Sequence, residues 1–121
     1  MWSNLLNKIL TQLLLVSFLI LSTEIEAADN TYYLVIENHV FKPSVIEIPP
    51  NKKVKLVIHN KDKLPEEFDS FDLNREKVIF AGKKSTIYIG PLPAGEYYFI
   101  GEYHPVSAQG KVLIKELKNA D

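Results

Sequence analysis

Short runs of alternating apolar and polar residues, separated by turn residues, dominate the chain from residue 30 onward. In one run Val54, Leu56 and Ile58 occupy every second position, which places them on one face of a β-strand. Six such runs predict strands over residues 31–37, 44–48, 53–59, 85–89, 97–102 and 111–116. Their spacing is typical of a sandwich of about seven or eight strands. The residues expected to form its core are Val54, Leu56, Ile58, Ile87, Ile89, Tyr97, Phe99, Val112 and Ile114.

The first 27 residues have a different character. Lys8 and the amino terminus give a weakly positive start, and the run Ile9–Leu21 is broken by only three polar residues. This run is too short for a membrane span, which needs about 20 apolar residues. The small residues Ala27 and Ala28 follow it. We therefore expect residues 1–27 to be a secretory signal peptide and residues 28–121 to be one exported domain. An uncleaved N-terminal anchor is the alternative.

Composition excludes several classes of function. The chain has 15 acidic and 14 basic residues, and this balance argues against a nucleic-acid or anionic-membrane partner. It has no cysteine, so disulfides, thiolate metal sites and cysteine nucleophiles are excluded. The sequence also contains no Ser–His–Asp order and no phosphate-binding loop. These observations favour binding over catalysis.

Two stretches between the predicted strands are candidate sites. The longest stretch expected to be irregular runs from residue 60 to about residue 75, and it is densely charged. Residues 103–110 precede the last predicted strand. Loops on a rigid sandwich commonly carry function, so we expect the site in these two stretches.

The order of these segments resembles that of a cupredoxin. Asn60 and Pro65 form an Asn-x4-Pro segment, Gly95 opens a Gly-x-Tyr turn into a strand, and Gly101 and His104 follow. In cupredoxins the first copper ligand, a histidine, follows the Asn-x4-Pro segment, and a Cys, a His and a Met precede the last strand. The resemblance covers nearly all of the mature chain. It implies an all-β, Greek-key β-sandwich preceded by an N-terminal signal-peptide helix.

Matched residue by residue, the resemblance implies an altered site. Glu66 stands at the position of the first histidine, and Gly101 stands at that of the cysteine. His104 occupies the place of the second histidine, and Gln109 falls near that of the methionine. A blue copper centre needs a thiolate beside two imidazoles, so this chain is not expected to form a type 1 centre or to be blue.

The donors that remain in the two loops are carboxylates, one amide and one imidazole. Such ligands favour Cu(II), iron, Mn(II) or Zn(II) over Cu(I). We expect a metal ion, Cu(II) or iron, with Glu66 and His104 close together at one end of the sandwich. The full set of candidate metal ligands is Glu66, His104, Glu102, Glu67 and Gln109.

Other residues near these loops have ordinary interpretations. His39 follows the first predicted strand and is expected to be structural or exposed. His59 ends a strand on its polar face and is expected to be solvated. Tyr97 lies two residues after Gly95, so we expect it to pin a turn from a corner position.

Four strings sharpen the resemblance: PEEFDS, LNREKVI, GPLPAGEY and FIGEYHPxxAQG. They are similar to those of EfeO-type cupredoxin-like domains, which stand alone in the periplasm or are fused to bacterial iron-uptake components. This resemblance implies a periplasmic protein that serves iron or copper uptake beside a membrane iron permease complex. Two alternatives stay open: a ferroxidase-like, copper-dependent oxidation of ferrous iron, and a metal-free sandwich that binds a partner protein. The sequence leaves the oligomeric state open.

Overall fold

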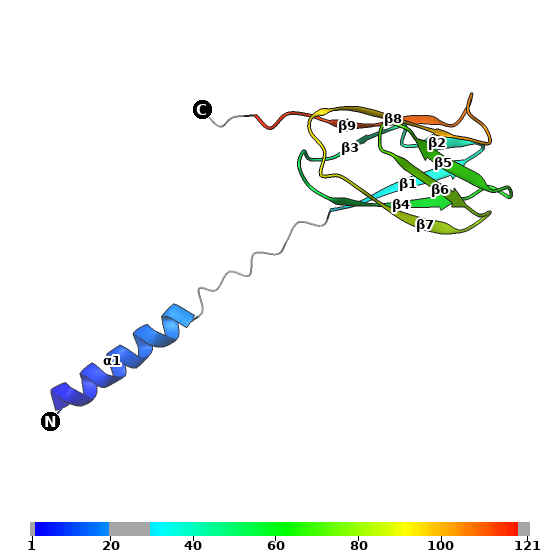
Figure 1. Ribbon diagram of the computed structural model, residues 1–121. Helices are drawn as coiled ribbons and strands as arrows, with labels where there is room; N and C mark the ends of the chain where they lie inside the picture. Colours follow the sequence, from blue (N-terminus) through cyan, green and yellow to red (C-terminus); the bar gives the residue numbers. More distant parts are fainter. Residues whose placement is uncertain (1, 20–29, 119–121) are drawn as a thin grey trace.

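The N-terminal run forms a helix. A computed structural model describes residues 2–19 and 30–118 (Figure 1). Within this part of the chain, α1 spans Trp2–Leu19, and no helix is long and apolar enough to cross a membrane. The expected cleavage position after Ala27 lies outside the described residues.

The described residues after α1 form nine strands in two sheets that face each other (Figure 1). The first sheet has the order β2 (Val40–Lys42), β1 (Thr31–Glu37), β4 (Val54–Asn60) and β7 (Lys84–Ile89). The second has the order β3 (Val45–Glu47), β9 (Gln109–Ile114), β8 (Gly95–Gly101), β5 (Glu66–Ser70) and β6 (Arg75–Ile79). The pairs β1–β4 and β3–β9 are parallel, and the remaining pairs are antiparallel. The predicted two-sheet sandwich is confirmed.

The core lies between the two sheets and contains the residues that the alternating pattern predicted. Every residue of the expected core is buried except Tyr97, which is half-buried and packs against the others. The Tyr97 hydroxyl donates a hydrogen bond of 2.8 Å to the Pro93 carbonyl, which confirms the corner role. The rings of Phe41, Phe68 and Phe99 lie 4.9–6.1 Å apart between centroids and fill the centre of the sandwich.

The expectation of an irregular stretch over residues 60–75 is wrong. It contains β5 and the first residue of β6. The inward positions of β5 are Glu66, Phe68 and Ser70, all buried, and only one of them is apolar. Polar residues facing inward remove the alternation by which a strand is recognised. Strands β2 and β6 were also not predicted, and the total of nine exceeds the expected seven or eight.

Strand directions bring three segments to one end of the sandwich. Because β1 and β4 are parallel, with Ile36 opposite Asn60, the turn after β1 and the loop after β4 lie at the same end. Strand β8 runs antiparallel to β5, and Phe68 is paired with Gly101. The start of β5 and the loop after β8 therefore meet. This end of the molecule carries the candidate site.

Candidate metal centre

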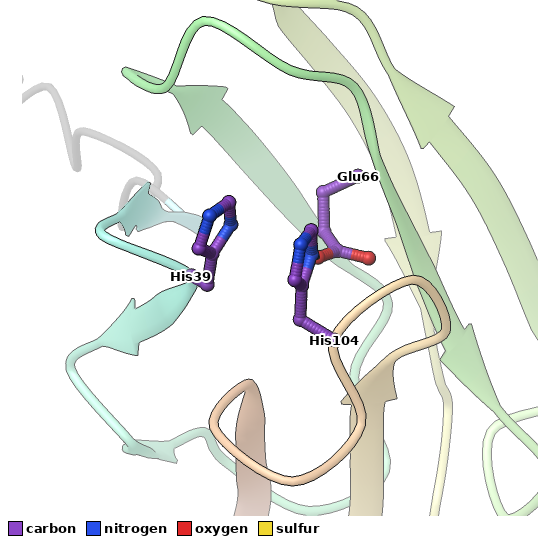
Figure 2. A group of neighbouring side chains, drawn as sticks. All are labelled: His39, Glu66 and His104. Carbon is purple, nitrogen blue, oxygen red and sulfur yellow. The ribbon is translucent and has the colours of Figure 1, made fainter.

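Glu66 is a buried carboxylate with a histidine against it. The residue is 1% exposed and points inward at the start of β5. Its Oε1 accepts hydrogen bonds from the backbone amides of Glu67 (3.0 Å) and Tyr103 (2.9 Å). Its Oε2 lies 2.7 Å from Nδ1 of His104, and Figure 2 shows the two side chains meeting. The predicted proximity of Glu66 and His104 is thus found in the structure.

Gly101 provides the space for this carboxylate. A Cβ atom at Gly101 would lie 2.7 Å from Cδ of Glu66 and 2.6 Å from Cβ of Ala108. The Gly101 amide also donates to the Ala108 carbonyl, and its carbonyl accepts from the His104 amide, which closes the loop tightly. At the position where the cupredoxin pattern has a cysteine, this chain has no side chain, and the carboxyl group of Glu66 fills the space.

His39 completes the group from the opposite sheet. It lies in the two-residue turn between β1 and β2, and its ring stacks on that of His104 with centroids 3.6 Å apart and planes 17° from parallel (Figure 2). One ligand atom from each of His39, Glu66 and His104 lies within 4.8 Å of the others. The side chains of His39 and His104 are 38% and 29% exposed, so solvent reaches the rings while the carboxylate stays buried.

An aspartate stands behind His39. The carboxylate of Asp62 accepts the backbone amides of Asn38 (2.7 Å) and His39 (3.0 Å), and its Oδ2 lies 3.5 Å from His39 Nδ1. Burial acts to raise the pKa of Asp62, but the two amide hydrogen bonds and the nearby His39 and His104 imidazoles outweigh it. The pKa of Asp62 is therefore held below its usual value, and the group is a carboxylate at neutral pH.

Two other predicted ligands point elsewhere. Glu67 follows Glu66 on β5 and alternates to the other face of the strand, where it is half-buried. Glu102 is exposed just after β8. Its pKa is raised, first by a hydrogen bond with Asp69 and then by slight burial and the surrounding negative charges. Neither belongs to the group of ligand atoms around His104.

A third predicted ligand, Gln109, is exposed at the start of β9. Its side-chain amide donates a hydrogen bond of 2.9 Å to the Pro105 carbonyl. This contact ties the start of β9 to the middle of the loop that carries His104.

Sequence reasoning missed the role of His39. The residue is neither purely structural nor simply exposed, because its ring stacks on a candidate ligand. The missing information was strand direction: β1 and β4 are parallel, so the turn after β1 lies beside the loop after Asn60. The Asn38-His39 pair directly after a strand, read as a hairpin turn, would have placed His39 at that end. His59, expected to be solvated, is half-buried on the outward side of β4.

Two imidazoles and one carboxylate are a suitable donor set for a transition metal. Two histidines with one carboxylate and open positions are characteristic of non-haem Fe(II), and nitrogen and oxygen ligands also suit Cu(II) and Zn(II). Two nitrogen ligands on one tetrahedral ion are about 3.3 Å apart. The three ligand atoms lie within 4.8 Å of one another, and Nδ1 of His104 and Oε2 of Glu66 are 2.7 Å apart, so the rings must shift to hold an ion. Both rings are partly exposed and have room to do so. The residues fit a metal ion other than type 1 copper, since the chain has no thiolate.

Comparison with solved structures places the fold. A chain of a heme-copper terminal oxidase dimer aligns with a TM-score of 0.61 at 16% identity, over 94% of this chain and 96% of that one. Auracyanin A, a blue copper protein of Chloroflexus aurantiacus, aligns with a TM-score of 0.61 at 12% identity, over 70% and 98%. A purple cupredoxin from Nitrosopumilus maritimus aligns with a TM-score of 0.54 at 20% identity, over 69% and 98%. At these identities the likeness concerns the fold alone.

Comparison of sequences also finds related proteins. The uncharacterized protein RP394 of Rickettsia prowazekii (strain Madrid E) is 37% identical over 83 residues, which are 69% of this chain. The match covers 66% of that relative's length. Residues 10–114 match the family described as the cupredoxin-like domain. The chain belongs to the family of cupredoxin-like domains.

Proposed function

We propose that this chain is an exported metal-binding protein that holds one cation, Cu(II) or iron, between His39, Glu66 and His104. The observation that carries the proposal is the convergence of three ligand atoms within 4.8 Å at one end of the sandwich. Of the ligands expected from the sequence, Glu66 and His104 are retained and His39 is added.

The residues have distinct roles in this proposal. Glu66 supplies a buried negative charge, and its carboxylate is held in place by two backbone amides. His104 already contacts that carboxylate through Nδ1, so a cation would replace a shared proton. The half-exposed rings of His104 and His39 leave a route for the ion to enter from solvent. The metal itself would supply positive charge and, if it is copper or iron, redox capacity.

Metal titration of the purified mature protein tests the proposal. We expect His39→Ala, Glu66→Gln and His104→Ala each to weaken binding of Cu(II) or Fe(II) about tenfold or more (about 1.4 kcal/mol). The matched control is His59→Ala, which removes the third histidine of the chain and should leave affinity unchanged. If the three site variants bind as tightly as the wild type, the cation lies elsewhere. If the wild type binds no metal, the metal-free interaction module becomes the better hypothesis.

Absorption spectroscopy tests the type of copper site. With Cu(II) bound, the protein should give only weak d–d absorption, because no thiolate is present for an intense charge-transfer band. A strong band near the wavelength of type 1 copper would contradict the ligand assignment.

The cellular role is proposed from the EfeO-type resemblance. Export to the periplasm and service to a membrane iron permease complex are supported by the apolar N-terminal run and the GEYHP and PEEF strings. Mass spectrometry of the protein from its native host tests export. We expect an N-terminus near Ala28, whereas an intact Met1 terminus in the membrane fraction would contradict cleavage.

A further inference from the structure

The turn that carries His39 has an unfavourable backbone. Asn38 and His39 both have positive φ angles, 53° and 57°, and they join β1 to β2 as a two-residue loop. Both central residues of such a turn lie in the left-handed region, which Asn tolerates and for which Gly is the usual second residue. A histidine at that position therefore needs an external support to stay in one conformation.

Asp62 supplies this support from the neighbouring loop. One of its oxygens accepts the Asn38 amide, and the other accepts the His39 amide and faces the His39 ring. Asp62 is itself fixed, because its own amide donates a 2.9 Å hydrogen bond to Oδ1 of Asn60. Asn60 is fully buried at the end of β4, and its side-chain amide donates to the carbonyls of Leu64 and Ile79. The position of His39 is thereby tied to the rigid first sheet.

We propose that Asp62 is the positioning residue of the metal centre: it clamps the Asn38–His39 turn and orients the His39 ring toward His104. This inference rests on the proposed function of the site. With Nδ1 of His39 facing the Asp62 carboxylate at 3.5 Å, the proton is favoured on Nδ1. The lone pair of Nε2 is then left for a cation, an arrangement common for metal-bound histidines.

A second aspartate provides a matched control. Asp72 also accepts a backbone amide, that of Tyr98 at 2.8 Å, and lies in the turn between β5 and β6 at the other end of the sandwich. Asp72→Ala removes a carboxylate and a backbone hydrogen bond without touching the His39 turn. It reports what such a loss does to the fold alone.

The first arm of the test uses the metal-free protein. In the wild type and in Asp72→Ala, NMR should show proton contacts between the stacked rings of His39 and His104, with His39 protonated on Nδ1. In Asp62→Ala these contacts should be lost and the preference for the Nδ1 proton removed, with the remaining amide spectrum unchanged. Asp62→Asn keeps one acceptor oxygen and should give an intermediate result. Intact ring contacts in Asp62→Ala would overturn the inference.

The second arm measures Cu(II) affinity in a double-mutant cycle. Asp62→Ala should weaken binding about tenfold, as removal of the carboxylate partner of a metal-bound histidine does. In the His39→Ala background the same change should weaken Cu(II) binding less than about twofold, because Asp62 acts only through His39. An equal loss in both backgrounds would mean that Asp62 does not act through His39. If the wild type binds no metal, the proposed function fails, and the NMR arm still decides whether Asp62 orients His39.

Discussion

Gly101 shows how one residue permits the site. The absent side chain leaves the volume in which the Glu66 carboxyl group lies, and a Cβ there would approach Cδ of Glu66 and Cβ of Ala108 within 3 Å. Both neighbours are buried, so neither can withdraw easily. The glycine and the buried carboxylate therefore depend on each other.

Gly101→Ala tests this dependence. We expect a loss of about 1–3 kcal/mol in the free energy of unfolding from overpacking, together with weaker metal binding. Urea titration measures the first and calorimetry the second. Gly82→Ala is the control, since a Cβ there meets nothing within 4 Å and only its positive φ of 70° opposes the change. Wild-type stability and affinity in Gly101→Ala would show that the pocket is looser than the distances indicate.

The raised pKa of Glu102 predicts how the stability of the domain depends on pH. A hydrogen bond with Asp69, then slight burial and the negative charges around it, raise the pKa of Glu102 above its usual 4.5. The folded state thus binds this proton more tightly than the unfolded state, and stability falls as pH rises from 4.5 through the folded pKa. Glu102→Gln should therefore raise the urea midpoint at pH 7, and the gain should disappear below pH 4. Glu116→Gln, at an exposed position after β9, should show no gain at pH 7.

The sequence alone predicted only part of the candidate site. Glu66 and His104 could be named because their positions in the cupredoxin pattern are fixed by the Asn-x4-Pro segment and the loop before the last strand. His39 could not, because its contact with His104 depends on the direction of β1 relative to β4. Candidate ligand positions set by local spacing can be predicted from a sequence, whereas those set by strand pairing need the fold.

Among the elements, strands with an apolar inward face were predictable and the others were not. Strands β4 and β7 appeared close to their predicted bounds with the expected residues buried, because every second side chain is apolar. Strand β5 was hidden, since it buries Glu66 and Ser70 for their hydrogen bonds rather than for their hydrophobicity. Strand β5 lacks the usual alternation of apolar residues because it carries the polar residues of the candidate site.

The Tyr97 hydrogen bond at the start of β8 is expected to stabilise the domain. The Tyr97 hydroxyl ties the strand to the Pro93 carbonyl four residues earlier. Tyr97→Phe keeps the ring in the core and removes only this bond, so the free energy of unfolding should fall by about 1 kcal/mol. Thermal unfolding followed by circular dichroism measures the change. An unchanged midpoint would mean that water replaces the bond without cost.

At the scale of the whole molecule, acidic residues from separate segments gather on the second sheet. Asp69 and Glu67 of β5 and Glu76 of β6 lie close enough to Glu102, just after β8, to raise its pKa. Basic residues are present on the same sheet, namely Arg75, Lys77 and Lys111. The near-neutral total of the sequence conceals this acidic cluster, because strand pairing brings together residues that are far apart along the chain. Net charge therefore bounds the class of partner but does not describe the surface.

The candidate metal centre joins the two sheets, and this predicts how a bound metal would affect the stability of the domain. His39 comes from the turn of the first sheet, whereas Glu66 and His104 come from the second. A cation bound only by the folded state adds about 2.7 kcal/mol of stability at a free concentration one hundred times its Kd. For a domain of this size, Tm should rise by about 10 °C or more, and a chelator should reverse the rise. His39→Ala removes the ligand from the first sheet and should lose most of this increment, while His59→Ala should keep it. An equal rise of Tm in His39→Ala would show that the ion binds within the second sheet alone.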